Sequence, residues 1–178
     1  MHRRTAVKYL FVVAAGSAIL PSCSYKTKAS IALKHLDINE EQEKLVGEIA
    51  ETIIPAGSAP GAKDTYAHLF VLKMVDACYD QHQQETFLAG LNEIEDIARQ
   101  KFGTSFLKCT SMQRNEIATL LETKKGPDNA IAFYAMMKPL TIQGYLTSRA
   151  VLGDIFKYEL VPGRYNGFFP VKTTIHPV

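Results

Sequence analysis

The chain has 178 residues, a formal net charge of +2 and a hydrophobic fraction of 47%. Its positive charge is concentrated at the start: six lysines and arginines precede Asp37, the first acidic residue, whereas the chain from Asp37 onward holds 14 basic and 18 acidic residues. This distribution argues against nucleic acid as a partner, and the length allows one domain with a sizeable core once a leader is removed.

The first 22 residues have the pattern of a signal peptide. Arg3, Arg4 and Lys8 form a basic beginning, and residues 9–20 form an apolar run. This run is too short to span a bilayer, which requires roughly 20 apolar residues. The arginine pair resembles the twin-arginine signal, which exports folded proteins. Because Ala6 stands where such signals usually carry a bulkier side chain, the general secretory route is an alternative.

A cysteine follows this apolar run. Residues 20–23 (LPSC) resemble a lipobox, in which a signal peptidase cuts before a cysteine that carries lipid, although Pro21 is unusual there. We therefore expect Cys23 to be lipidated and to hold the protein at the periplasmic side of a bacterial membrane, since each buried methylene contributes about 0.8 kcal/mol. The alternatives are a plain signal peptide with an incidental cysteine and an uncleaved anchor.

The mature chain divides into two parts. Residues 23–36 are predicted to be the lipidated cysteine and a flexible tether, because they are polar and lack helical periodicity. Residues 37–178 are predicted to form one all-α domain, a compact bundle of about five helices with an extended, aromatic-rich C-terminal segment.

The first two predicted helices flank a loop of small residues. Asp37 or Asn39 can cap a helix that Pro55 ends, and residues 56–62 form a loop by composition. Asp64 can then cap a second helix, whose apolar stripe runs towards Cys78.

Three longer helical patterns and a short one follow. Residues 83–102 carry an apolar stripe, with Gly103 placed as a C-terminal cap. Residues 110–113 fit a capping box at the start of a fourth helix. A fifth begins near Pro127 and runs to about Tyr145, with Pro139 inside it as a predicted kink. Residues 147–156 are predicted to form a last short helix.

Two cysteines are left once Cys23 is assigned to lipid. Cys78 and Cys109 could pair in an oxidising compartment or stay as two buried or half-buried thiols, and their spacing does not decide between these states. Neither lies in a CxxC motif, which argues against a zinc or redox site.

Motifs of a catalytic centre are missing from the sequence. The histidines after the leader form neither HExxH nor a Glu-x-x-His pair, and GxGxxG, GxxxxGK[ST], GxSxG and CxxCH are absent. Paired carboxylates such as Glu40 and Glu41 lie among polar neighbours, as is typical of a solvated helix face. We therefore expect no catalytic residue, no metal site and no cofactor in this chain.

Two sequence blocks are distinctive in combination. Residues 52–62 read TIIPAGSAPGA, and residues 144–148 (GYLTS) are followed by residues 158–167 (YELVPGRYNG). With the arginine-bearing leader, these blocks resemble the gluconate 2-dehydrogenase subunit 3 family over essentially the whole mature domain. Ser58 and Ala59 depart from the Asp-Thr pair that is frequent in the first loop of that family.

The resemblance implies a small, non-catalytic subunit of a membrane-associated dehydrogenase that oxidises a sugar or sugar acid. It also implies a partner that is similar to flavin-dependent glucose-methanol-choline oxidoreductases and carries the FAD. Electrons would leave through a cytochrome c subunit or another acceptor. The small subunit would carry the export signal for a partner that lacks one. The alternative is a stand-alone helical envelope lipoprotein that binds a ligand or an envelope component.

The C-terminal block and the helix end before it are the predicted partner interface. It combines glycine and proline, which allow a close, fixed backbone approach, with arginine and aromatic side chains of the kind that dominate interfaces. The residues are Gly144, Tyr145, Pro162, Gly163, Arg164, Tyr165 and Phe168. The alternative is that this segment packs on the helices of its own chain. For the loop over residues 55–62, the alternative to a contact is an ordinary helix connector.

Overall fold

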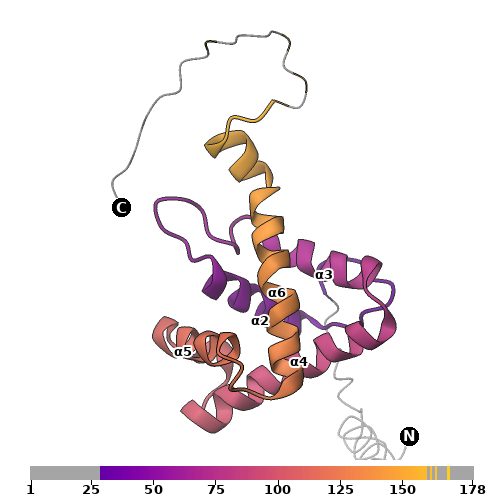
Figure 1. The fold of residues 1–178 in the computed structure, drawn as a ribbon, viewed down its shortest axis with the longest axis vertical. Coiled ribbons are helices and arrows are strands. Elements are labelled where there is room, and N and C mark those ends of the chain that lie inside the picture. The colour runs from indigo at the N-terminus through magenta and orange to yellow at the C-terminus, as the bar shows by residue number, and fades with distance from the viewer. Residues whose placement is uncertain (1–28, 160, 162, 164–167, 169–178) are drawn as a thin grey trace, which may run out of the picture.

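The structure is a computed structural model, which describes residues 29–159, 161, 163 and 168. These residues fold into five α-helices and two short helical turns, which confirms the predicted all-α bundle (Figure 1). The elements are α2 (Glu40–Ile53), α3 (Ala67–Cys78), α4 (Gln81–Phe102), η1 (Phe106–Lys108), α5 (Ser111–Glu122), α6 (Asp128–Leu146) and η2 (Ala150–Ile155). The predicted export signal with Arg3, Arg4 and Lys8, and the predicted lipidation site Cys23, lie outside the described residues.

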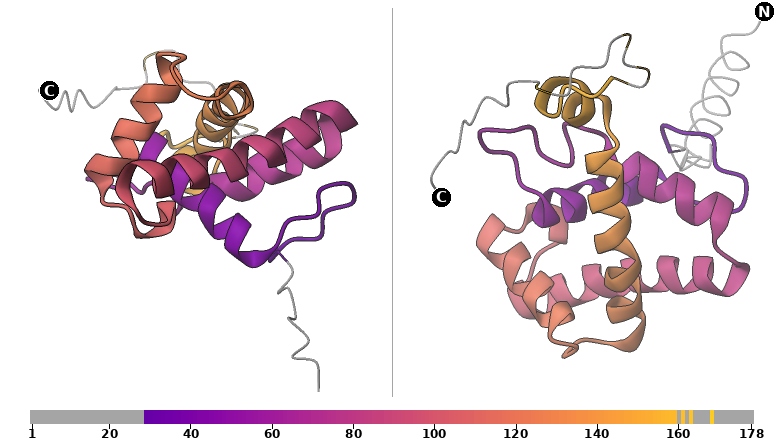
Figure 2. Two further views of the ribbon diagram at one scale, coloured as in Figure 1. Left: turned by 90° about the horizontal axis from the view of Figure 1, so that it is seen from below. Right: turned by 45° about the horizontal axis from the view of Figure 1, so that its top comes forward.

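Helix α6 is the centre of the bundle. It packs across α4 and contacts α2, α3 and α5, as the views in Figures 1 and 2 show. Where α6 meets α4, the rings of Phe87 and Phe133 lie with their centroids 4.6 Å apart and tilted by 45°. The largest fully buried side chains come from α6, its four neighbouring helices and η2, and they are Phe87, Phe133, Leu72, Leu91, Ile94, Ile117, Met137, Val46, Val71, Val75, Val151 and Thr141.

Most of the predicted helix ends are confirmed. Asn39, rather than Asp37, caps α2, since its side chain accepts a hydrogen bond from the Gln42 N–H at 2.9 Å. Thr110 caps α5 in the predicted capping box, and Gly103 ends α4 with a positive φ of 68°. Pro139 lies inside α6, which continues to Leu146.

The start of α3 differs from the prediction. Asp64 does not cap this helix, because its carboxylate accepts the N–H of Gly61 at 3.0 Å within the preceding loop. The N-cap residue is Tyr66, which has a positive φ of 56° and makes no side-chain capping bond. The prediction for Asp64 was wrong because an aspartate can bond equally well to a loop N–H.

Two cysteines, and one short helical turn after α6, lie in the described part of the chain. Cys78 is an exposed free thiol and Cys109 a buried one, so no disulfide joins them in the structure. The short helix predicted over residues 147–156 corresponds to η2, a turn of π-helix. Among the described residues, no helix is long and apolar enough to cross a membrane.

Residues 29–38, which we call the N-terminal segment, pack against the bundle. Leu36 and Ile38 are buried, and the backbone N–H groups of residues 34–36 donate to the carboxylate of Asp76 on α3. The prediction of a flexible tether is therefore wrong for residues 29–36, because a carboxylate 40 residues further along the chain binds them. For residues 23–28, which lie outside the described residues, the tether stays a prediction.

Candidate partner-binding surface

The end of α6 leads into η2 through a well-connected backbone. Val151 is buried and attaches η2 to the bundle, and its N–H lies 3.3 Å from the Ser148 hydroxyl oxygen, which accepts it. The N–H of Phe156 donates to the Val151 carbonyl at 2.9 Å, and the N–H of Tyr158 donates to the Leu152 carbonyl at 2.8 Å. These bonds define the course of the chain up to Tyr158.

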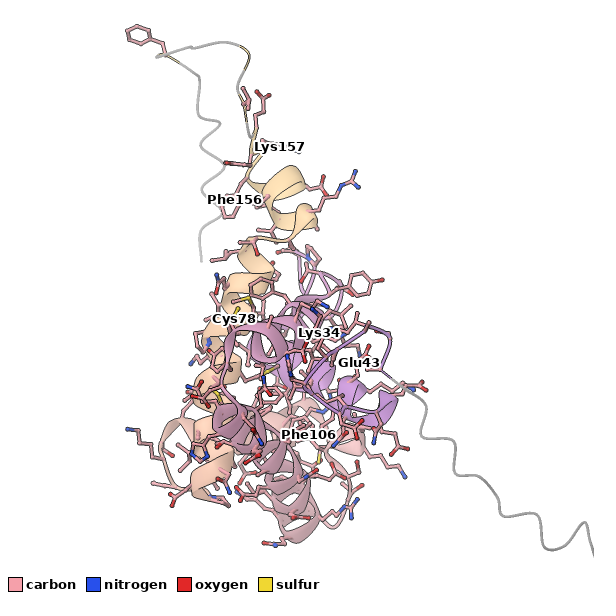
Figure 3. All side chains as sticks on the ribbon, turned by 90° about the vertical axis from the view of Figure 1, so that its right-hand side faces the viewer. Lys34, Glu43, Cys78, Phe106, Phe156 and Lys157 are labelled. Carbon is pink, nitrogen blue, oxygen red and sulfur yellow. The ribbon has the colours of Figure 1, made fainter. Side chains whose placement is uncertain are left out.

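Large apolar side chains are exposed along this part of the molecule. We define the C-terminal surface as Ile142, Leu146, Ile155, Phe156, Tyr158 and Val161, whose exposed fractions run from 39% to 82%. Figure 3 shows Phe156 and Lys157 near one another towards the upper end of the molecule. Exposed apolar groups that gather on one part of a surface mark interaction sites, and aromatic residues dominate the binding energy of interfaces.

Two of the predicted interface residues belong largely to the bundle itself. Gly144 is buried, and a Cβ atom added to it would lie 2.9 Å from Cδ1 of Phe70 on α3. This glycine therefore lets α6 approach α3 closely. The prediction that Gly144 contacts a partner is wrong, because Phe70 covers it. Tyr145 is half-buried and packs against the core.

The other predicted interface residues follow η2. Gly163 and Phe168 are exposed, and a Cβ atom on Gly163 would meet nothing within 4 Å. Pro162, Arg164 and Tyr165 lie outside the described residues, so their role stays a prediction.

Sequence reasoning missed the part of this surface that α6 and η2 supply. Ile142 and Leu146 are spaced four residues apart, which places them on one helix face. Ile142 falls between Thr141 and Gly144, which α6 buries near its end, and Leu146 follows Gly144. That spacing was a usable signal, although it does not show by itself which of two apolar faces is buried.

The loop between α2 and α3, the first of the two distinctive blocks, is held by Glu51. One carboxylate oxygen of Glu51 accepts the N–H of Ala56 at 2.8 Å, and the other accepts the N–H of Lys63 at 2.9 Å. Residue 61 is glycine because a Cβ atom there would lie 2.5 Å from a Glu51 oxygen. The two ends of the loop are joined by the N–H of Ala62, which donates to the Ile54 carbonyl at 2.9 Å.

The loop and η2 lie at the same end of the molecule, as both the view of Figure 1 and the tilted view of Figure 2 show. Residues 55–58 of the loop are exposed there. Two blocks that are about 90 residues apart in the sequence thus reach one end of the fold. This arrangement favours a shared contact role over a simple connector for the loop.

The charged groups within the bundle hold the helices together. Glu48 on α2 accepts hydrogen bonds from Lys63 and from Arg114 on α5. Burial by itself would raise the pKa of Glu48, but these two cations lower it below the ordinary value. Arg114 also donates to the carbonyls of Phe106 and Leu107, at 3.2 and 2.8 Å, which joins α5 to η1.

Metal-ligating side chains do not cluster among the described residues. No group of three His, Cys, Asp or Glu side chains among them is placed to hold a metal ion. His68 is half-buried, and burial lowers its pKa, which favours the neutral imidazole. Its Nδ1 atom is buried without a hydrogen-bond partner among the described residues, which is uncommon for a buried polar atom.

Comparison with known families identifies the fold that carries this surface. A model described as gluconate 2-dehydrogenase subunit 3 matches residues 40–163. The chain belongs to the gluconate 2-dehydrogenase subunit 3 family. No curated protein and no solved structure matches it.

The limits of the family match separate two parts of the structure. The match begins at the first residue of α2 and includes the Glu51 loop, α6, η2 and the C-terminal surface. The N-terminal segment precedes it. Membership of the gluconate 2-dehydrogenase subunit 3 family makes the chain an accessory subunit of a dehydrogenase, and the C-terminal surface lies within the part that defines this membership.

Proposed function

We propose that the chain is a non-catalytic subunit that binds the catalytic flavoprotein of a sugar or sugar-acid dehydrogenase, supports its export and stability, and tethers it to a membrane. The observation that carries this proposal is the exposed C-terminal surface, which lies within the family match. Exposure of Leu146, Phe156 and Tyr158 to water is unfavourable in free energy for an isolated monomer. A bound partner would cover these side chains and remove that cost.

The surroundings of the C-terminal surface suit a protein partner. Arg149, Asp154, Lys157 and Glu159 are exposed beside the apolar residues and carry both signs of charge. Protein interfaces typically combine an apolar centre with a polar, solvated rim. Burial of the apolar centre would supply affinity, and the mixed charges would orient the partner.

The sequence before the described residues supplies the rest of the proposal. Arg3, Arg4 and Lys8 would direct export, and Cys23 would carry the lipid that holds the complex at the periplasmic side of the membrane. A twin-arginine route would let a folded flavoprotein travel as a bound passenger. The FAD and the catalytic base would then belong to the partner, and a cytochrome c subunit or another acceptor would take the electrons.

Affinity purification of the tagged chain from membranes, followed by mass spectrometry and absorbance spectroscopy, tests the proposal. We expect a large flavoprotein to be recovered with the chain, and we expect the chain purified alone to show neither flavin absorbance nor dehydrogenase activity. Recovery of no flavoprotein would leave the stand-alone lipoprotein, and flavin bound to the isolated chain would contradict the accessory role.

Replacement of the proposed lipidation site tests the membrane attachment separately. The Cys23→Ser variant, produced without the partner, should move to the soluble periplasmic fraction. The matched variant Cys78→Ser should stay with the membrane, since Cys78 is an exposed thiol within the folded domain. Membrane retention of the Cys23→Ser variant would count against lipidation.

A further inference from the structure

We propose that Asp76 holds the N-terminal segment on the bundle so that the lipid anchor keeps the domain close to the membrane, with the C-terminal surface free for the partner. The inference rests on the proposed lipidation of Cys23. The docked segment itself precedes the family match, so family membership does not imply it.

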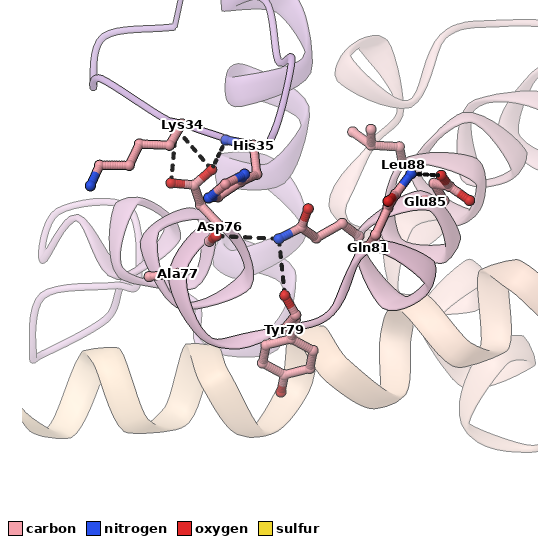
Figure 4. A pocket seen from close by; sticks show the side chains of 9 residues that line it. Lys34, His35, Asp76, Ala77, Tyr79, Gln81, Glu85 and Leu88 are labelled. Carbon is pink, nitrogen blue, oxygen red and sulfur yellow. Dashed lines mark hydrogen bonds between the residues drawn. The ribbon is translucent and has the colours of Figure 1, made fainter.

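Asp76 binds three consecutive backbone N–H groups. This side chain on α3 is 3% exposed. Each of its carboxylate oxygens lies 3.0 Å from the nitrogen of Lys34, and one of them also accepts the N–H groups of His35 at 2.7 Å and Leu36 at 2.9 Å. Figure 4 shows the carboxylate facing Lys34 and His35. Successive N–H groups that converge on one anion form a strong, charge-assisted site.

The carboxylate of Asp76 remains ionised in this site. Burial by itself would raise its pKa, but the N–H groups of residues 34–36 and the nearby His35 lower the pKa below its ordinary value. The N–H groups of the segment therefore stabilise the buried negative charge of Asp76. Loss of the segment would leave that charge without partners, which couples docking of the segment to the state of α3.

Apolar contacts and three further hydrogen bonds secure the remainder of the segment. Leu36 and Ile38 are buried in the core, and Ala29, Ile31 and Leu33 pack against it. The backbone N–H and the hydroxyl of Ser30 both donate to the Glu43 carboxylate, and Lys73 Nζ donates to the Ala32 carbonyl at 2.9 Å. The segment is thus attached from its first described residues to α2.

Docking shortens the part of the chain that can act as a tether. An extended chain advances about 3.5 Å per residue, so the stretch from Cys23 to Ala29 can reach about 20 Å, whereas a stretch that is free as far as Asp37 could reach about 50 Å. Ser30 lies at the first turn of α2, next to Glu43. Figure 3 shows Glu43 well away from Phe156, so a short tether beside α2 leaves the C-terminal surface unobstructed.

Hydrogen exchange of the full-length, lipidated protein in vesicles of phosphatidylethanolamine and phosphatidylglycerol tests docking. We expect the amides of residues 34–36 to exchange roughly tenfold or more faster in the Asp76→Ala variant than in wild type. The Asp96→Ala variant, which removes an exposed aspartate from α4, should exchange like wild type. Asp76→Asn keeps one acceptor oxygen and should be intermediate. Unprotected amides in the wild-type segment would overturn the proposal.

Energy transfer from the domain to acceptor lipids in the same vesicles tests the reach. A fluorophore on Met112→Cys in a Cys78→Ser background reports the height of the domain, because Met112 is exposed on α5 and Cys109 is buried. Asp76→Ala should lower the transfer efficiency and broaden its distribution. If the protein is lipidated and wild type and Asp76→Ala show equal transfer efficiency, the short tether is overturned but the tethering role is not. If the protein carries no lipid, both the short tether and the tethering role are overturned. Recovery of the partner is a separate measurement and tests the partner-binding role.

Discussion

The two irregular segments that flank the helical bundle contain similar side chains and use them in opposite ways. Before α2, the N-terminal segment places Leu36 and Ile38 in the core and gives three N–H groups to Asp76. After α6, Phe156, Tyr158 and Val161 are exposed. Apolar composition alone therefore does not reveal where a segment packs. A buried carboxylate that collects backbone N–H groups marks the first segment as intramolecular, and exposure makes the second available to another chain.

Removal of the carboxylate that holds the N-terminal segment should have the largest effect on stability. Asp76→Ala leaves the N–H groups of residues 34–36 without their acceptor and should lower the free energy of unfolding by about 2–4 kcal/mol. Asp76→Asn should cost less, because an amide oxygen remains. Chemical denaturation at neutral pH measures both variants. A loss below about 1 kcal/mol for Asp76→Ala would show that apolar contacts alone hold the segment.

Glu51 offers a smaller version of the same test in the loop between α2 and α3. Glu51→Ala removes the acceptor of the Ala56 and Lys63 N–H groups, which lie at a more exposed place than the N–H groups bound by Asp76. We expect a loss of about 1–2 kcal/mol and reduced recovery of the partner, since the loop lies at the same end as the C-terminal surface. Glu51→Gln, which keeps an acceptor oxygen for only one of the two N–H groups, should be intermediate. Unchanged stability in Glu51→Ala would mean that the loop keeps its shape by other contacts.

Gly144 distinguishes packing from partner contact within α6. Gly144→Ala places a methyl group against Phe70, at an overpacking cost of about 1–3 kcal/mol, while alanine gains about 1 kcal/mol over glycine in a helix. The net loss should be about 1 kcal/mol in thermal or chemical unfolding. Phe70→Leu in the same background should recover part of it. A stabilised Gly144→Ala variant would show that α6 and α3 are less closely packed than the structure indicates.

The contrast between the segments also explains what the sequence could and could not predict. The helices were predictable because Asn39, Thr110 and Gly103 are local signals that act within three or four residues. The prediction that Asp64 caps α3 was wrong because its carboxylate binds a competing local partner, the N–H of Gly61. The docking of the N-terminal segment was not predictable, since it depends on Asp76, about 40 residues away in the sequence and adjacent only in the fold.

The candidate surface was predictable in location and only partly in its residues. The C-terminal block lies at the same end of the chain as the exposed apolar side chains of η2, and Gly163 and Phe168 are exposed there. Gly144 was misassigned because a glycine that admits a partner and one that admits a neighbouring helix look the same in a sequence. Leu146 and Phe156 were missed because exposure of an apolar side chain is a property of the packed bundle.

Acid should weaken the N-terminal segment in a way that depends on Asp76, with a smaller effect than the substitutions above. The pKa of Asp76 in the fold lies below its unfolded value of about 3.9, so its bonds contribute fully above that pH and are lost as the pH falls through the folded pKa. The stability difference between wild type and Asp76→Asn should therefore shrink below about pH 4. Glu48 titrates in both proteins and cancels in the comparison. A constant difference from neutral to acidic pH would contradict this role.

Binding of the partner by matched surface variants tests the central claim most directly. Leu146→Asp combined with Phe156→Asp should leave the unfolding free energy within about 0.5 kcal/mol of wild type, because both side chains are already exposed. The control is Met112→Asp, a still more exposed apolar position on α5. In affinity purification from membranes, we predict that the double variant recovers roughly tenfold less flavoprotein than wild type and that Met112→Asp recovers as much. Equal recovery by the double variant and wild type would contradict the account.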